Sequence, residues 1–495
     1  MKKKTIFSNN PYIWAFTTYF AEGFPYSIIR TVSGLFFRDM KVSLESIGLT
    51  PLFGLPWILK FLWGPQVDNY STKKRWMVTS QSLIVVMLLL AAVFIPFDNN
   101  VSLIAILFFL GAFVAATNDI AIDGYYMEAL DKDGQSKFVG YRVMAFRVAW
   151  MTGPGVIATI GTTTGWVPAF LAAALIFFIF TIYHIFFLAE VEEPGETFYS
   201  MIKRILKIKT FLSILTLLSL IISVRLFFGS SIYKNLEIKF PVLKKFYFSH
   251  WIAILLLISL ILVALFRKKL GAMIIGDKDS FYGKAFYYFM EREKISVILF
   301  FLILLRAGEW AVTVMVAPLI VDLGIKTHYG WISGGVGLPA SIIGAMLGGW
   351  MISRFSLRKV IWPFILLQNL TNIVYMFLAI HLSSFIQLNQ GNDTPVSIGT
   401  VNLIFTAAVH SFDQFASGLG TAVLMTYLMR ICHKEFKAAH YAIGTGLMNI
   451  SGLFAGVMSG FIAGWLGYAW LFGISFILSV PAMVVIPFLP YLEEK

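Results

Sequence analysis

The sequence predicts an all-α protein that crosses a membrane many times, and two observations carry that prediction. Of its 495 residues, 58% are hydrophobic, 47 are phenylalanine and only 13% are charged, and the mean hydropathy is +0.79. Soluble domains average about 25% charged residues, so this composition excludes an ordinary soluble fold. The apolar runs are also long and continuous, whereas the strands of a membrane β-barrel are short and alternate in polarity.

The net charge of +13 does not indicate a nucleic-acid-binding protein. The basic residues fall in short clusters between apolar runs, which is the pattern of loops on the cytoplasmic side of a membrane. The basic start, Met1 to Lys4, has no small-residue cleavage site after it, so we expect a lead-in to the first span and not a cleaved signal peptide. The single cysteine, Cys432, excludes an intrachain disulfide and a cysteine-ligated metal site.

The apolar runs fall into two sets of six with a pair between them, which predicts about fourteen transmembrane helices. The first set is expected at 12–37, 46–66, 76–97, 101–128, 138–162 and 166–189, and the second at 295–322, 329–353, 359–382, 397–430, 438–464 and 467–489. The inserted pair is expected at 211–230 and 250–266. Three parts follow: a six-helix bundle at 1–190, a cytoplasmic linker with two extra helices at 191–294, and a second six-helix bundle at 295–495.

The loop charges set the expected orientation. Short basic clusters follow the second span of each set, and further ones follow the inserted pair and precede the run at 438–464, all on one side of the membrane. Both termini are therefore expected in the cytoplasm. One segment disagrees, because Lys234, Lys239, Lys244 and Lys245 lie in a loop that this topology places outside. Either the inserted pair is a tolerated exception, or one of its members does not span.

The two sets also resemble copies of each other. Gly64-Pro-Gln-Val-Asp68-Asn69 leads to Lys73-Lys74 after the second span of the first set, and Gly349-Trp-Met-Ile-Ser353-Arg354 leads to Arg358-Lys359 in the second. Both resemble, in degenerate form, the Gly-x-x-x-Asp-Arg-x-Gly-Arg-Arg loop of the major facilitator superfamily. A repeat of this kind implies a central site near the midplane that opens alternately to each side. The alternative is a basic turn that only obeys the positive-inside rule.

Three stretches resemble a narrower family, the AmpG-type muropeptide permeases, and more distantly the acetyl-coenzyme A transporters. They are Leu55-Pro56-Trp57 to Asp68, Asn118-Asp119-Ile-Ala-Ile-Asp123-Gly124 with Gly140-Tyr141-Arg142, and Phe412-Asp413-Gln414 to Thr421; the third favours AmpG. The resemblance implies proton-driven import of anhydro-muropeptides across the bacterial inner membrane. Glu22 departs from the family pattern, which puts the substrate in question more than the fold.

Asp119 and Asp123 are four residues apart, so on a helix they share one face inside a membrane span. Intramembrane acids are either functional groups or partners of buried cations. From the helical rise, Arg142 on the next span matches Asp123 in depth and Arg147 matches Asp119. We therefore expect Asp123 with Arg142 in a cytoplasmic gate, and Asp119 facing Arg147 as the deeper proton candidate.

Other charges lie near the midplane and leave alternatives open. Arg306 and Glu309 are three apart and could neutralise each other, and Lys60 could pair with Glu22. Alternatively, the cations give a cavity a positive lining for an anionic ligand, with aromatic rings suited to sugars. The proton-coupling candidates are Asp119, Asp123, Glu22, Glu309 and Asp413; the substrate-cavity candidates are Tyr26, Arg30, Trp57, Lys60, Arg147, Trp150, Arg306 and Trp310; the cytoplasmic-gate candidates are Asp68, Lys73, Lys74, Arg75, Asp123, Arg142, Arg354 and Arg358.

The sequence also argues against two other classes of membrane protein. A membrane-bound transferase would need a nucleophile–base or metal constellation, and no such spacing is found; no Gly-x-x-x-x-Gly-Lys-Ser/Thr sequence exists for an ATP-driven pump. We therefore predict a transporter and no enzyme, with no catalytic residues, metal or cofactor. Its partners would be a small glycopeptide, protons and the bilayer, with the chain as a monomer. A carrier of acetyl-coenzyme A or another anionic metabolite is the alternative.

Overall fold

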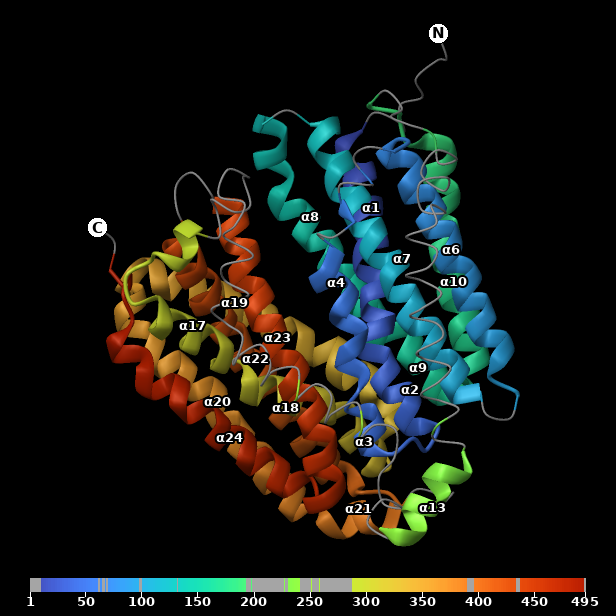
Figure 1. Cartoon of the computed structure of the whole chain (residues 1–495), viewed down its shortest axis with the longest axis vertical. Coiled ribbons are helices and arrows are strands. Elements are labelled where there is room, and N and C mark those ends of the chain that lie inside the picture. The colour runs from blue at the N-terminus through green and yellow to red at the C-terminus, as the bar shows by residue number, and fades with distance from the viewer. Residues whose placement is uncertain are drawn as a thin grey trace.

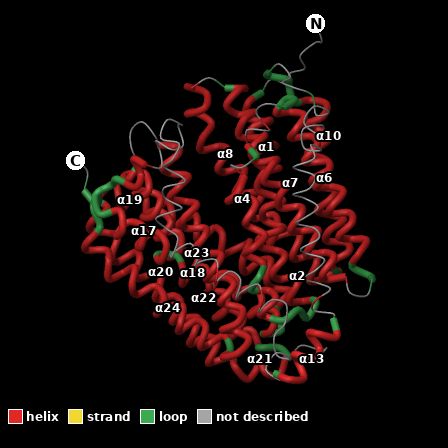
Figure 2. Tube along the Cα trace, viewed as in Figure 1, coloured by secondary structure: helices red, strands yellow, loops and turns green. Residues whose placement is uncertain are grey.

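The computed structural model describes residues 10–60, 70–97, 100–130, 132–192, 230–240, 287–389, 396–432 and 437–493, with a few isolated positions between them. Every element in these ranges is a helix (Figure 1, Figure 2). The all-α architecture predicted from the composition is confirmed.

The helices at the start of the chain form the first set, α1 to α10. They are α1 (Pro11–Ser27), η2 (Ile28–Val32), α2 (Ser33–Asp39), α3 (Leu44–Ile47), η3 (Thr50–Gly54), α4 (Leu55–Leu59), α6 (Lys73–Phe94), α7 (Asn100–Ala129), α8 (Lys132–Thr152), η5 (Gly153–Ile157), α9 (Ala158–Thr164) and α10 (Trp166–Phe187). Local signals fix the starts of two of them: the Asn10 side chain caps α1 ahead of Pro11, and the Thr72 hydroxyl accepts the Arg75 amide at the start of α6.

The helices of the second set run from α17 to α24. They are α17 (Ile295–Leu304), α18 (Ala307–Asp322), η7 (Lys326–His328), η8 (Gly330–Gly337), α19 (Leu338–Phe355), α20 (Leu357–His381), α21 (Ser383–Asn389), α22 (Gly399–Ile431), α23 (Lys437–Leu466), α24 (Tyr468–Val485) and η9 (Ile486–Phe488). The predicted span 295–322 breaks at Arg306, whose φ of −105° lies outside the helical range and separates α17 from α18.

Packing within the two sets follows one pattern. In the first set α1 packs on α8 and α6 packs on α10; at matching places in the second set α18 packs on α23 and α20 packs on α24. Two ends can be named in Figure 1. The basic end is where α1 begins and where Lys73 and Arg358 lie, and the far end is where α2 and α18 end, at Asp39 and Asp322.

Nine helices in the described ranges are long and apolar enough to cross a membrane. Large apolar side chains on their outer faces, such as Phe186 on α10 and Val484 on α24, are exposed in the isolated chain, as lipid-facing residues are. The predicted spans 12–37, 46–66 and 397–430 do not meet that standard. Their described residues are mostly helical, but they carry many of the polar residues of the candidate site.

The inserted helices predicted at 211–230 and 250–266 lie outside the described residues, apart from isolated positions. Between them, α13 (Ser231–Lys239) is described, with Ser230 as its N-cap. It lies beside the far end of the bundle, opposite the start of the chain (Figure 1). Lys234 and Lys239 therefore lie at the far end, away from the basic end, and both the membrane side of this loop and the spanning of the pair stay predictions.

The two sets touch at the far end through pairs of glycines. A Cβ added to Gly334 of η8 would lie 2.8 Å from the Cα of Gly155 in η5, and one added to Gly48 would lie 3.0 Å from the Cα of Gly460 in α23. Such backbone-to-backbone contact is possible only without side chains. These contacts join η5 to η8 and the start of the second span to α23, so each links the first set to the second.

Candidate functional site

A cavity of about 320 Å³ lies between the two sets. It collects side chains from η2, η3, α8, α18, η8, α19 and α22, so neither set forms it alone. Six of the eight predicted cavity residues line it: Tyr26, Arg30, Arg147, Trp150, Arg306 and Trp310. Trp57 instead packs edge-on against Tyr26, with ring centroids 5.0 Å apart, and Lys60 lies in a neighbouring charge cluster.

Two arginines give the cavity a positive wall. Arg30 donates from Nη1 to the carbonyl oxygen of Pro51 at 2.9 Å, and its guanidinium lies 5.7 Å from the ring centroid of Trp310 across the cavity. Arg147 lines the same wall. Neither makes an ion pair with any residue that the structure describes. Because a guanidinium matches a carboxylate in shape and charge, this wall suits an anionic ligand.

The opposite wall carries acids of the second set. Arg306 pairs with Glu309 through two hydrogen bonds, 2.6 and 2.8 Å long, as the alternative of mutual neutralisation predicted. Asp413 also lines the cavity but has no cation within ion-pair distance among the described residues. Its Oδ1 lies 2.6 Å from the Thr371 hydroxyl and its Oδ2 lies 3.4 Å from the side-chain amide of Gln414.

The paired aspartates of α7 lie between the cavity and the basic end. Asp123 accepts from Arg142 at 3.4 Å and from the Tyr19 hydroxyl at 3.0 Å, so the predicted Asp123–Arg142 pair is present. The predicted contact of Asp119 with Arg147 is wrong: Asp119 pairs with Lys60 at 3.3 Å. The helical rise places Asp119 and Arg147 at similar depths, but Arg147 lies on the face of α8 that lines the cavity. The alternative of a Lys60–Glu22 ion pair is not found either.

The other polar residues of the motif around Asp119 hold neighbouring helices together. The side chain of Asn118, fully buried, donates to the carbonyl oxygen of Ala21 at 3.0 Å and accepts from Gln81 at 3.2 Å, which ties α7 to α1 and α6. Gln81 also meets His184 at 2.7 Å. Gly124 has no side chain because the methylenes of Lys73 cross it, with Cε 2.7 Å from where a Cβ would stand.

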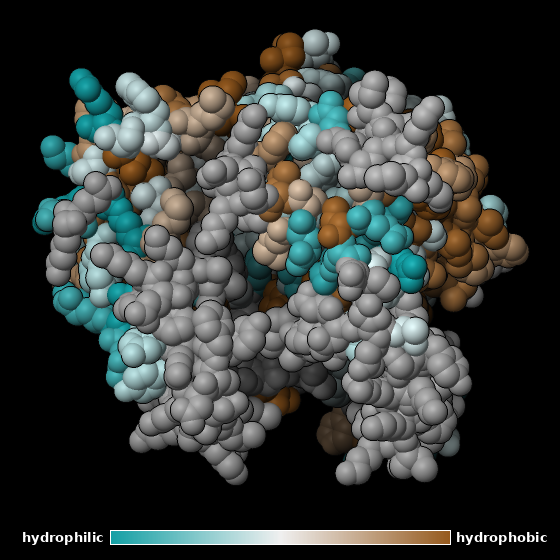
Figure 3. Space-filling view, turned by 90° about the horizontal axis from the view of Figure 1, so that it is seen from above, coloured by the Kyte–Doolittle hydropathy of each residue, from teal (hydrophilic) through white to brown (hydrophobic). Residues whose placement is uncertain are grey.

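Of the predicted gate residues at the basic end, Lys73, Asp123, Arg142 and Arg358 form ion pairs within their own set. Lys73 contacts Glu192 through both its amide and its Nζ, and Arg358 pairs with Glu493. Lys74 is half-buried, whereas Arg75 and Arg354 are exposed. Asp68 lies outside the described residues. In the part of the chain that the structure describes, no ion pair joins the two sets at this end, and Figure 3 shows the surface hollowed near its middle.

The far end holds a charged network that the sequence analysis missed. Arg38 of α2 donates two hydrogen bonds of 2.6 Å to Asp322 of α18, and Tyr468 donates to the same carboxylate at 2.7 Å. Beside it, Lys326 pairs with Asp39, which also accepts from the indole of Trp166 at 2.7 Å. A usable signal existed, because the first span of each set ends in charges of opposite sign, Arg38-Asp39 in one copy and Asp322 with Lys326 in the other.

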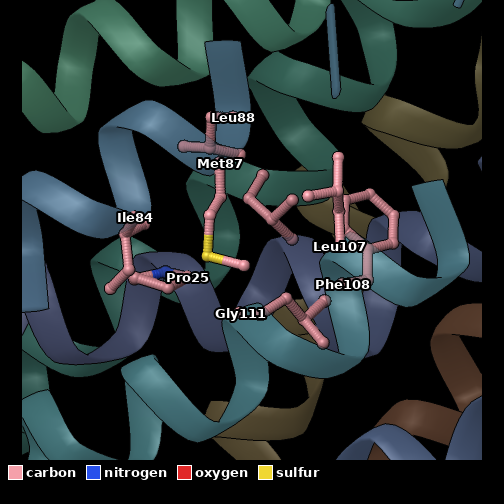
Figure 4. Close-up of a pocket in the computed structure, with 9 residues that line it drawn as sticks. Pro25, Ile84, Met87, Leu88, Leu107, Phe108 and Gly111 are labelled. Atoms are coloured by element: carbon pink, nitrogen blue, oxygen red, sulfur yellow. The ribbon is translucent and has the colours of Figure 1, made fainter. Parts of the chain in front are cut away.

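A second cavity is too small for a substrate. It measures about 20 Å³, lies between α1, α6 and α7, and is lined by apolar side chains such as Met87 and Phe108 (Figure 4). It is a packing void inside the first set. No group of three His, Cys, Asp or Glu side chains able to hold a metal ion was found in the described ranges.

Comparison with known proteins agrees with this architecture. The family model of the Major Facilitator Superfamily matches residues 5–289 and 298–495. The chain is 22% identical to the anhydromuropeptide permease of Escherichia coli K12 over 94% of this chain and 77% of that protein. It is 23% identical to a Haemophilus influenzae protein over 99% of this chain and 96% of the relative.

Among solved structures, the peptide transporter POT in complex with sulfate superposes with a TM-score of 0.64 at 12% identity, covering 96% of this chain and 94% of that one. At that identity the likeness concerns the fold. The resemblance to AmpG-type permeases noted in the sequence is confirmed by the curated relatives. With the family model matched along nearly its whole length, the chain is a multi-pass membrane protein and a secondary transporter that belongs to the major facilitator superfamily.

Proposed function

We propose that this protein imports anhydro-muropeptides by proton-coupled alternating access across a bacterial inner membrane. The basic end faces the cytoplasm, with both chain termini, because its loops carry most of the Lys and Arg residues outside the inserted region. The far end faces the periplasm. The three-part division at 1–190, 191–294 and 295–495 belongs to the same proposal, as two bundles that rock about the cavity.

The observation that carries the substrate class is the unpaired positive wall of the cavity. Arg30 and Arg147 face the cavity with no carboxylate partner among the described residues, so a ligand that brings carboxylates would complete them. Tyr26, Trp150 and Trp310 beside them offer apolar ring faces, which suit a sugar ring. A disaccharide–peptide carries both chemical features, and a curated relative is named an anhydromuropeptide permease.

The conformation is that of a carrier closed at the far end. Arg38–Asp322 and Asp39–Lys326 join the two sets there, whereas the predicted gate pairs at the basic end stay within one set. In the proposed orientation this is the state that has released substrate to the cytoplasm. Binding of a new substrate from the periplasm would require both far-end pairs to part.

Uptake into membrane vesicles tests the proposal. Vesicles that contain the protein should accumulate radiolabelled anhydro-muropeptide when a proton gradient is imposed, and should not accumulate it when an uncoupler is present. Uptake that ignores the gradient would contradict proton coupling. Preference for acetyl-coenzyme A over the muropeptide would replace the proposed substrate by the alternative one.

Substitution of the arginines tests the binding site in the same vesicles. Arg30→Gln and Arg147→Gln should each raise the KM for the muropeptide, because loss of a charge-assisted hydrogen bond costs about 1.5–3 kcal/mol. Lys359→Gln is the matched control, since it removes an exposed cation at the basic end that is outside both the cavity and the set of gate candidates. Unchanged KM in both cavity variants would place the substrate elsewhere.

A further inference from the structure

Five charged side chains form a cluster between the cavity and the basic end. Three are carboxylates, Glu22, Asp119 and Asp123, and two are cations, Lys60 and Arg142. The cluster therefore has one acid more than it has bases. At membrane depth an ionised carboxylate without a cation is costly, so the identity of the remaining acid matters.

Geometry assigns each cation to an aspartate. Lys60 Nζ lies 3.3 Å from Asp119, whose side chain is only 9% exposed. Arg142 Nη1 lies 3.4 Å from Asp123, and the Tyr19 hydroxyl bridges the same two groups at 3.0 and 2.9 Å. Both aspartates are thus compensated in this conformation.

Glu22 is the acid that remains. It makes no ion pair or hydrogen bond with any described residue, and its Oε2 is enclosed without a partner. The charged and titratable groups around it come from every neighbouring helix and are all engaged elsewhere. They are Tyr19 on its own helix, Lys60 next to α4, Asp119 and Asp123 on α7, Arg142 on α8 and His184 on α10, which is held by Gln81 and Thr17.

The position of Glu22 links it to the cavity. Glu22 and Tyr26 lie four residues apart on α1, so they share one face, and Arg30 follows four residues later in η2; Tyr26 and Arg30 line the cavity. Glu22 is thus about 6 Å along the helix axis from Tyr26. Towards the basic end, Asp123 of the same cluster is 43% exposed, so the cluster that contains Glu22 reaches solvent on that side.

Asp413 is a second buried acid with no cation within ion-pair distance among the described residues, and its setting differs. Both of its oxygens have a neutral hydrogen-bond neighbour, Thr371 or Gln414, and it lies in the wall of the cavity itself. A carboxyl in that place is suited to contact the substrate. Glu22 has no such donors and does not line the cavity, so it can change charge without touching the ligand.

We propose that Glu22 is the residue that binds and releases the transported proton. The proposal rests on the proposed proton-coupled import and names the group that performs the coupling. A proton from the periplasmic side binds the Glu22 carboxylate and neutralises the excess charge of the cluster. It leaves to cytoplasmic water when the basic end is open, while Lys60 and Arg142 keep their aspartates.

Infrared difference spectroscopy tests this without any substrate. On a pH titration the purified protein should show the carbonyl band of a protonated carboxyl group that disappears as the proton leaves. The band should be absent in Glu22→Gln and should persist in Asp119→Asn, Asp123→Asn and Asp413→Asn. A band that survives in Glu22→Gln, or vanishes only in one of the aspartate variants, would overturn the proposal.

Transport provides the second readout. Glu22→Gln should lose gradient-driven accumulation of the muropeptide but keep counterflow, which needs binding and alternation without net proton movement and also shows that the variant is folded. Glu22→Asp should keep some gradient-driven uptake, because it retains a carboxyl group. Gradient-driven uptake in Glu22→Gln would contradict the proposal for Glu22. A wild-type protein that never transports the muropeptide would contradict the proposed function instead, and the infrared result alone would then decide on Glu22.

Discussion

At the scale of single residues, the pairing of acids and cations decides what each acid can do. The sequence placed Asp119 and Asp123 on one helix face, and the structure confirms the Asp123–Arg142 pair. The sequence could not identify Lys60 as the partner of Asp119. The rise of a helix gives the depth of a residue, but it does not say which neighbouring helix each face contacts. Lys60 follows α4 and reaches α7 through tertiary packing alone.

The two ion pairs of α7 should differ in strength. A double-mutant cycle with Asp119→Asn and Lys60→Met should give a coupling energy of about 1–3 kcal/mol, because Asp119 is buried. The same cycle with Asp123→Asn and Arg142→Met should give less than about 1 kcal/mol, because that pair is more open to water. The free energy of unfolding in detergent micelles measures both, and equal couplings would show that burial does not separate them.

At the scale of elements, small residues allow helices to approach closely. The sequence Gly344-Ala-Met-Leu-Gly348-Gly349 has the glycine spacing that is typical of close helix contacts, and α19 packs tightly on α22. A Cβ on Gly344 would lie 2.9 Å from the backbone carbon of Phe415, and one on Gly348 would lie 2.9 Å from the Cβ of Ala422. Gly349 faces open space, so adjacent glycines in one motif have different roles. The difference is the direction in which each residue faces around the helix axis.

This contrast yields a matched pair of variants in one helix. Gly344→Ala should destabilise the protein by about 1–3 kcal/mol, because the added methyl group meets backbone that cannot move aside. Gly349→Ala should be neutral or should stabilise by about 0.5–1 kcal/mol, since alanine favours a helix more than glycine does. Thermal unfolding followed by circular dichroism would compare them, and similar losses would mean that the α19–α22 contact is looser than the structure has it.

At the scale of the whole molecule, the sequence predicted two bundles and a gate, but not which end is closed. A carrier that alternates must encode at least two arrangements of the same residues, so one sequence is compatible with a closed basic end or a closed far end. The predicted gate residues Lys73, Arg142 and Arg358 pair within their own sets here. The pairs that do join the sets, at Arg38 and Asp39, became recognisable only when α2 and α18 were placed side by side.

The ion pairs at the far end should stabilise the conformation in which that end is closed. Asp322→Asn removes the negative charge that faces a mostly buried arginine and should open the far end, because an amide can accept only one of the two 2.6 Å bonds that Arg38 donates. In a background with Cys432→Ser, Thr313→Cys places a thiol in the cavity wall. An impermeant maleimide added from the side of the far end should label it faster when Asp322→Asn is present. The double change Arg38→Asp with Asp322→Arg should slow labelling again by restoring the pair, whereas Glu493→Gln, which breaks a pair inside the second set, should leave it unchanged. Equal labelling in all four proteins would show that the glycine contacts close the far end without help from the charges.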